Sequence, residues 1–260
     1  MQSVRQIYFF FCLANIAVLP FPIMKPQQLH LKKLEKEIKK LEKKHVGVSN
    51  KNNLIIASDS KGRFLRNQMS FNTHLNIQYR SGAKVNNNQL KSIVFRKIQS
   101  VQHPIVALWF GTCELTTKDG DFISLTTNIE TKITDIITQY KELKREIITR
   151  NNRSKVIFLE CPYFSLLEWN KHKNHPNPDL FSEQQKILEA SIDKLNKEMQ
   201  SINGNIRRTR ISQDMVFSTK CKGKSQKYSI DYSLLKDGIH PGEVLTKLWL
   251  LKINSLLSDF

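Results

Sequence analysis

The sequence predicts one α/β domain, in which helices cover a parallel sheet, preceded by an N-terminal extension. From Leu54 onward, short β-branched or apolar runs alternate with longer stretches of helical period, which is typical of a parallel sheet covered by helices. The chain has 260 residues, of which 40% are hydrophobic. That content is enough to bury one large core, and it excludes a disordered chain.

Each predicted element follows from a local pattern. Four short apolar runs are the predicted strands, at residues 54–58, 75–80, 105–110 and 156–160. Helical periodicity predicts four helices, within residues 87–101, 123–150, 181–202 and 241–257. In the third of these helices, six apolar residues recur at helical spacing and are expected in the core: Phe181, Ile187, Leu188, Ile192, Leu195 and Met199.

Residues 1–24 contain an apolar run at positions 7–19 behind Arg5, which is similar to the start of a secretory signal peptide. Asn15 interrupts the run, no small-residue cleavage site follows it, and it is short for a transmembrane helix. We therefore expect a cytoplasmic or nuclear protein. The alternative is a secreted or membrane-associated protein, if residues 7–19 act as a signal.

Residues 25–52 are predicted to form a basic helix and a linker ahead of the folded domain at 53–260. Four apolar side chains form one stripe along this helix: Leu31, Leu34, Ile38 and Leu41. The stripe covers two heptads, fewer than a stable coiled coil usually needs. A solvated helix is therefore favoured over weak self-association through residues 31–45.

The four cysteines are scattered along the chain, at Cys12, Cys113, Cys161 and Cys221. They form no C-x-x-C pair and no cluster with histidine. We therefore predict free thiols rather than a disulfide framework or a zinc site.

Candidate site residues lie where the predicted strands end, because the functional crevice of an open α/β sheet lies outside the carboxyl ends of its strands. Ser60 follows the first predicted strand, and an Asp-x-x-His pair precedes the last helix. A serine hydroxyl needs an imidazole to take its proton, and the imidazole needs an acceptor to orient it. Ser60, His240 and Asp237 suit these three roles.

Four segments resemble, in order, the four sequence blocks of the SGNH (GDSL-type) hydrolases: IIASDSKGRFL, RSGAKV, WFGTCEL and DGIHP. The resemblance implies a flavodoxin-like three-layer α/β/α sandwich and a serine esterase that needs no metal or organic cofactor. It implies Ser60 as the nucleophile, His240 as the base and Asp237 as the group that orients the base. It also implies that the backbone N–H groups of Ser60 and Gly82 form part of an oxyanion hole.

Two positions depart from the family pattern. Ser58 stands at the usual Gly of the first block, and Cys113 stands at the usual Asn of the third block. The side-chain amide of that Asn would donate to the oxyanion, whereas a thiol is a weak donor. Loss of one such donor typically costs a factor of about 10²–10³ in kcat. Thr112 could supply a hydroxyl donor instead.

The resemblance therefore implies a hydrolase that acts on a small acyl or acetyl ester. The alternative is a binding module with weakened chemistry, of the kind associated with invertebrate retroelements, that binds nucleic acid. The formal net charge of +18 favours such an anionic partner. The side chains expected to contact phosphates are Lys39, Lys40, Lys43, Lys44, Arg207, Arg208 and Arg210.

Overall fold

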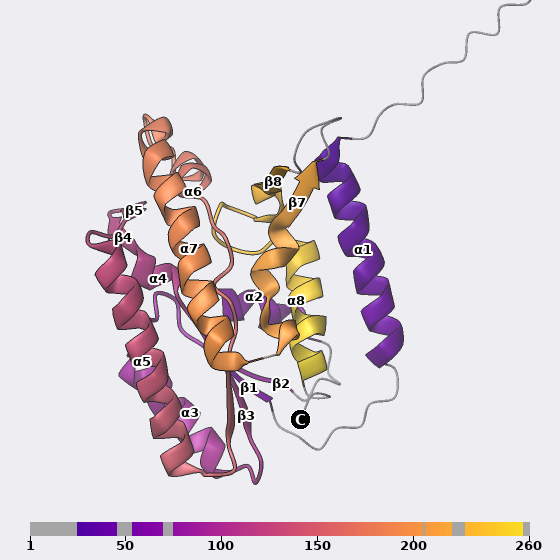
Figure 1. Cartoon of the computed structure of the whole chain (residues 1–260), viewed down its shortest axis with the longest axis vertical. Helices are drawn as coiled ribbons and strands as arrows, with labels where there is room; N and C mark the ends of the chain where they lie inside the picture. The colour runs from indigo at the N-terminus through magenta and orange to yellow at the C-terminus, as the bar shows by residue number, and fades with distance from the viewer. Residues whose placement is uncertain (1–24, 46–53, 70–74, 205, 220–226, 257–260) are drawn as a thin grey trace, which may run out of the picture.

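A four-stranded parallel sheet forms the centre of the structure (Figure 1). The computed structural model describes residues 25–45, 54–69, 75–204, 206–219 and 227–256. The strands are β1 (Leu54–Ser58), β2 (Leu75–Tyr79), β3 (Ile105–Trp109) and β6 (Lys155–Phe158). They lie in the order β2-β1-β3-β6, which is the flavodoxin-like order, and all four were predicted. β1 and β3 are buried along their whole length, as continuous apolar strands of a parallel sheet require.

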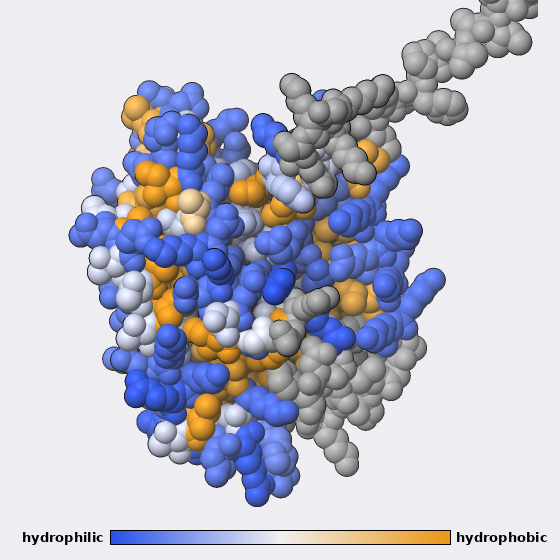
Figure 2. All heavy atoms as spheres, viewed as in Figure 1, coloured by the Kyte–Doolittle hydropathy of each residue, from blue (hydrophilic) through white to orange (hydrophobic). Residues whose placement is uncertain are grey.

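Helices cover both faces of this sheet, which makes three layers (Figure 1). α2 (Lys61–Asn67) and α8 (Glu243–Ser255) lie on one face, and α3 (Asn88–Gln99) and α5 (Ile129–Arg150) lie on the other. On the α8 side, Trp109 of β3 meets Trp249 edge to face, with ring centroids 5.6 Å apart. The expected three-layer α/β/α sandwich is confirmed. Figure 2 shows hydrophilic residues over most of one face of the molecule, with hydrophobic residues confined to patches between them.

α7 (Ser182–Asn203) covers the outer edge of β6. The side chain of Asn203 accepts from the N–H of Phe158 at 2.9 Å and donates to its carbonyl at 2.6 Å, as a neighbouring strand would. Asn196 makes the same pair of bonds to the backbone of Cys161, each at 2.8 Å. The predicted core stripe of this helix has one exception, because Ile187 is 49% exposed.

α1 (Pro26–His45) packs against α8 instead of standing in solvent. Leu34 and Ile38 are buried within the main core, and the other two residues of the stripe are partly buried against it. An ion pair at 2.8 Å between Lys247 and Glu42 also joins the two helices. The expectation of a solvated helix is therefore wrong. The buried side chains of α8 lie on more than one side of the helix, so its outer face must also be shielded from water. The apolar stripe of α1 packs against this outer face.

The second strand of a β-hairpin occupies the start of the segment predicted as one helix at 123–150. α4 (Thr112–Leu115) leads into β4 (Thr116–Asp119) and β5 (Phe122–Leu125), which pair antiparallel around a turn at Gly120. α5 starts only at Ile129. A run of four residues such as β5 is too short to distinguish the helical period from the strand period. Its pairing with β4 therefore decides that it forms a strand.

The remaining elements lie between β6 and α8. They are α6 (Leu166–His172), η1 (Pro178–Phe181), η2 (Arg207–Thr209), η3 (Ile211–Met215), β7 (Val216–Thr219), β8 (Lys227–Ile230) and η4 (Tyr232–Leu234). β7 and β8 form an antiparallel ribbon that the sequence analysis did not predict. No helix in the described part of the chain has the length and hydropathy to cross a membrane. The apolar run 7–19, the linker at 46–53, Cys12 and Cys221 lie outside the described residues, and Cys113 and Cys161 are free thiols.

Candidate active site

Ser60, His240 and Asp237 form a continuous hydrogen-bonded chain beyond the carboxyl end of β1. Nε2 of His240 lies 2.9 Å from Oγ of Ser60, and Nδ1 of His240 lies 2.7 Å from Oδ2 of Asp237. The structure thus brings together the three side chains that the sequence analysis selected. A neutral His240 with its proton on Nδ1 donates to Asp237 and accepts from Ser60, so this tautomer satisfies both bonds.

A tight loop holds Asp237 against His240. Oδ1 of Asp237 accepts from the backbone N–H of Ile239 at 3.1 Å and from that of His240 at 2.8 Å. Burial raises the pKa of Asp237, but the hydrogen bonds from His240 and Ile239 outweigh burial and lower the pKa to about 2. The carboxylate is therefore ionised at neutral pH and can stabilise a protonated His240.

Gly238 allows this loop to pack closely against α6. Its φ of +88° lies in the left-handed region, and a Cβ at this position would lie 2.5 Å from the backbone nitrogen of Trp169. The carbonyl of Gly238 also accepts from the N–H of Ser165 at 2.7 Å. Only glycine allows this close contact, and the contact holds the loop that carries Asp237 and His240 in place.

Ser60 lies between two buried neighbours of opposite charge. Asp59 and Lys61 form an ion pair in which each side chain is 1% exposed, and Nζ of Lys61 donates to Oγ1 of Thr112 at 2.9 Å. Burial disfavours the charge on Lys61, but the carboxylate of Asp59 outweighs burial and holds the Lys61 pKa above its usual value. The pair connects the turn that carries Ser60 to the residues that follow β3.

The N–H groups of Ser60 and Gly82 have no hydrogen-bond acceptor among the described residues, and both residues line the pocket described below. Gly82 has a φ of +73°, and open space lies where a Cβ would stand. Cys113 lines the same pocket, and burial raises the pKa of its thiol to about 12. The thiol is therefore protonated at neutral pH and is a weak donor. Oγ1 of Thr112 accepts from Nζ of Lys61, and a hydroxyl that accepts a hydrogen bond can still donate its own proton, so this contact leaves Thr112 a candidate for the substitute donor.

Glu114 connects the second and third sequence blocks. Its Oε1 accepts from the N–H of Val85 at 2.7 Å, and its Oε2 accepts from the N–H of Gly111 at 3.0 Å. The side chain is 4% exposed, and this burial raises the pKa of Glu114. These bonds fix the loop of Gly82 next to the segment that carries Cys113.

A pocket of about 570 Å³ lies beside Ser60 and His240, a volume in the range of small-molecule sites. The hairpin β4–β5, α6 and the second block form its walls. Its lining residues are Ser60, Arg63, Ser81, Gly82, Lys84, Thr112, Cys113, Glu114, Thr116, Thr117, Lys118, Ile123, Thr126, Lys132, Trp169, Ile239 and His240.

Two aromatic side chains that the sequence analysis missed frame His240. The ring of Phe64 stacks on the imidazole with centroids 4.8 Å apart, and the centroid of the Trp169 ring lies 6.0 Å away. Trp169 also donates from Nε1 to the carbonyl of Asp121 at 3.0 Å, which ties α6 to the hairpin. Phe64 follows Ser60 by four residues, and this helical spacing could have indicated that the two side chains lie on the same side of the helix. Trp169 lies in a segment with no regular pattern, so no signal pointed to it.

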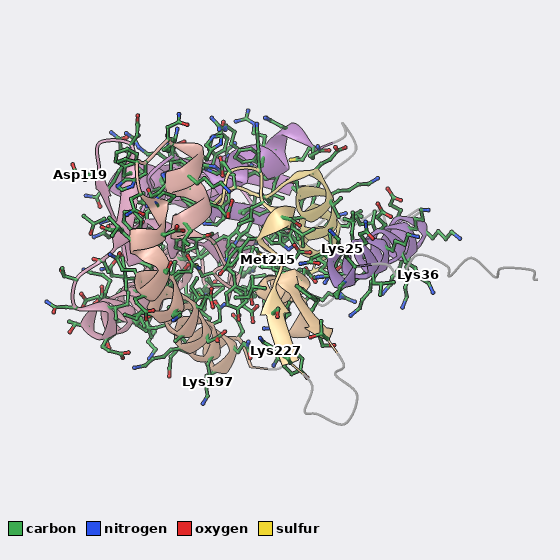
Figure 3. The ribbon with its side chains drawn as sticks, turned by 90° about the horizontal axis from the view of Figure 1, so that it is seen from above. Lys25, Lys36, Asp119, Lys197, Met215 and Lys227 are labelled. Atoms are coloured by element: carbon green, nitrogen blue, oxygen red, sulfur yellow. The ribbon has the colours of Figure 1, made fainter. Side chains whose placement is uncertain are left out.

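The residues predicted to contact phosphates do not line this pocket. Lys39, Lys40, Lys43 and Lys44 are exposed on α1, and α1 lies on the opposite side of the molecule from the labelled Asp119 of β4 (Figure 3). Arg210 is exposed. Arg208 was predicted to face a phosphate, but its Nη1 donates to the carbonyl of Ser255 at 2.6 Å, because the end of α8 leaves carbonyls that need donors. Arg207 lies in η2, and its side chain is outside the described set.

No three His, Cys, Asp or Glu side chains gather, within the described ranges, in a way that could hold a metal ion.

The comparisons with known proteins gave matches among solved structures, whereas no family model and no curated protein matches the chain. A GDSL-like lipase from Bacteroides thetaiotaomicron is 15% identical, with 85% of this chain and 97% of that chain covered and a TM-score of 0.46. A lipase/acylhydrolase from Enterococcus faecalis is 12% identical, with 80% and 96% covered and a TM-score of 0.43. A catalytic mutant of an acetylxylan esterase from Geobacillus stearothermophilus is 11% identical, with 82% and 96% covered and a TM-score of 0.44.

The fold is SGNH hydrolase-like. This assignment rests on the strand order of the sheet and on the positions of the four sequence blocks in this chain. Residues of all four blocks line one pocket beyond the carboxyl ends of the strands, which is the arrangement that the sequence resemblance implies.

Proposed function

We propose that this protein is a serine hydrolase that cleaves acyl esters. The observation that best supports this proposal is the hydrogen-bonded chain from Ser60 through His240 to Asp237, beside a pocket of about 570 Å³. A hydroxyl, an imidazole and an ionised carboxylate in this order form the general arrangement of a base-activated nucleophile.

In the first half of the reaction, Ser60 acts as the nucleophile. Its hydroxyl proton passes to Nε2 of His240 as Oγ bonds to the ester carbonyl carbon, and the carbonyl electron pair moves onto oxygen. Asp237 stabilises the resulting imidazolium, which its lowered pKa permits. The tetrahedral intermediate then expels the alcohol, which takes its proton from His240 and leaves an acyl-Ser60.

In the second half, His240 removes a proton from water, and the hydroxide attacks the acyl carbon. The bond from that carbon to Oγ breaks, Oγ regains the proton from His240, and the carboxylic acid leaves. In both halves the oxyanion is stabilised by the N–H groups of Ser60 and Gly82. The Cys113 thiol adds a weaker third contact, so we expect a modest kcat.

The proposal is tested by labelling the full chain with a fluorophosphonate probe while following the hydrolysis of a nitrophenyl acetate. The variants are Ser60→Ala and His240→Ala. Ser92→Ala is the matched control, since this serine is exposed on α3, does not line the pocket and donates to the carbonyl of Asn88 within its own helix. We expect both site variants to lose labelling and at least about 10³-fold in kcat, with the control unchanged. A folded parent that is not labelled, or a Ser60→Ala variant with full activity, would contradict the proposal.

A further inference from the structure

The pocket beside Ser60 carries four basic side chains, Arg63, Lys84, Lys118 and Lys132. Glu114 is the one acidic residue among those that line it in the described chain. Its two carboxylate oxygens are occupied by the N–H groups of Val85 and Gly111, and its side chain is 4% exposed. The carboxylate is therefore turned to the backbone, and the lining is strongly positive.

The counterions within the described residues do not cancel this charge. Lys118 lies 3.9 Å from Asp121, and Lys132 lies 3.5 Å from Asp135. All four of these side chains are at least 39% exposed, and exposed pairs of this kind hold their partners only weakly. They leave both lysines able to contact another anion.

Arg63 and Lys84 have no carboxylate partner among the described residues. The guanidinium of Arg63 lies over the ring of Phe64, 5.1 Å from the ring centroid. Both residues are exposed and both line the pocket. These two cations are therefore available to a ligand.

The two unpaired cations are attached to the segments that carry the proposed chemistry. The N–H of Arg63 donates to the carbonyl of Ser60 at 3.2 Å, so Arg63 lies one helical turn beyond the nucleophile. Lys84 follows Gly82 by two residues. Charges of one sign along the wall of a cleft raise the local concentration of an oppositely charged substrate. Arg63 also has the planar geometry that suits carboxylate and phosphate groups.

We infer that the substrate of this site is an ester that carries a second, negatively charged group, a carboxylate or a phosphate, which binds beside Arg63 and Lys84. This inference rests on the ester hydrolysis proposed above and adds the class of substrate. The charge selects the substrate, and Ser60 and His240 carry out the reaction.

The test compares matched ester pairs with the full chain. The first pair places a free carboxylate, or its methyl ester, at the far end of the acyl group of a nitrophenyl ester. The second pair places a carboxylate or its methyl ester on the phenol of an aryl acetate. The third pair places a phosphate or its dimethyl ester at that same position. The pairs thus separate carboxylate from phosphate, and the acyl side from the alcohol side.

The quantity measured is the ratio of kcat/KM for the anionic ester to that for its neutral partner, each corrected for its spontaneous hydrolysis. At low salt we expect a ratio of about 10 or more for at least one pair, since one well-placed charge contact is worth about one factor of ten. In about 1 M salt, where the Debye length is about 3 Å, the ratio should fall towards unity.

Arg63→Gln and Lys84→Gln are each expected to lower this ratio several-fold. Lys97→Gln is the matched control, because Lys97 is an exposed lysine on α3 that does not line the pocket, and it should keep the parental ratio. Equal kcat/KM within every pair would overturn the inference and leave the proposed hydrolysis standing. A folded chain that hydrolyses none of the esters would overturn both.

Discussion

Lys61 is buried next to the proposed nucleophile, and its removal is the perturbation with the clearest energetic consequence. Its ammonium group is paired with the carboxylate of Asp59, and both side chains are 1% exposed. In Lys61→Met the carboxylate would stay in the core without its cation, and Oγ1 of Thr112 would lose its donor. A buried charge without a partner must either be solvated by a rearrangement or be protonated, and both cost free energy.

The expected loss follows from that burial. Removal of one partner of a buried ion pair typically costs about 3–5 kcal/mol, which is a large part of the roughly 5–15 kcal/mol that stabilises a domain. The double variant Asp59→Asn/Lys61→Met removes both charges, keeps the shape of residue 59 and keeps an unbranched side chain one atom shorter at residue 61. It should therefore be more stable than Lys61→Met alone, although it still loses the ion pair.

The assay is urea unfolding at neutral pH, followed by tryptophan fluorescence, with Lys97→Met as the control for a lysine in an exposed position. We expect the control to stay within about 0.5 kcal/mol of the parent. The reasoning is refuted if Lys61→Met loses less than about 1 kcal/mol, or if the double variant is no more stable than the single one.

Three further predictions concern the site. Cys113→Asn replaces a weak donor with an amide and should raise kcat for a neutral acetate by up to about 10²-fold, whereas Cys113→Ala should not raise it; steady-state kinetics of both variants decide. Gly238→Ala should lower kcat by about tenfold or more and reduce the thermal midpoint, because φ is +88° and the new Cβ would meet the Trp169 backbone at 2.5 Å. Gly120→Ala, with φ of +57° and no atom within 4 Å, is its control, and an equal loss of kcat there would contradict the explanation. Asp237 has a folded pKa of about 2 against an ordinary value of 3.8, so its ionisation stabilises the fold above pH 4, and about 2 kcal/mol is lost as the pH falls through 2. Asp237→Asn should lack this loss in acid unfolding curves, and a variant with the parental acid dependence would refute the assignment.

Some features of the fold could be predicted because the evidence for them is local. β1 was predicted at residues 54–58 and has those bounds, since five consecutive residues buried on both faces leave a continuous apolar run. Asp237 and His240 are three residues apart, so one loop suffices to bring them into contact. The stripe on α1 was likewise visible from its spacing alone.

The sequence by itself thus determined which segments are strands and helices with an apolar face, and which residue types lie at strand ends. Tertiary structure alone decided what each face meets: α8 covers the stripe of α1, β4 pairs with β5, and Lys61 is buried against Asp59. It also decided that Ser60 meets His240, 180 residues along the chain, and that Arg208 binds the end of α8. The physical reason is that a local pattern states what a segment must bury or bond, whereas its partner is fixed by the strand order and by the packing of the whole chain.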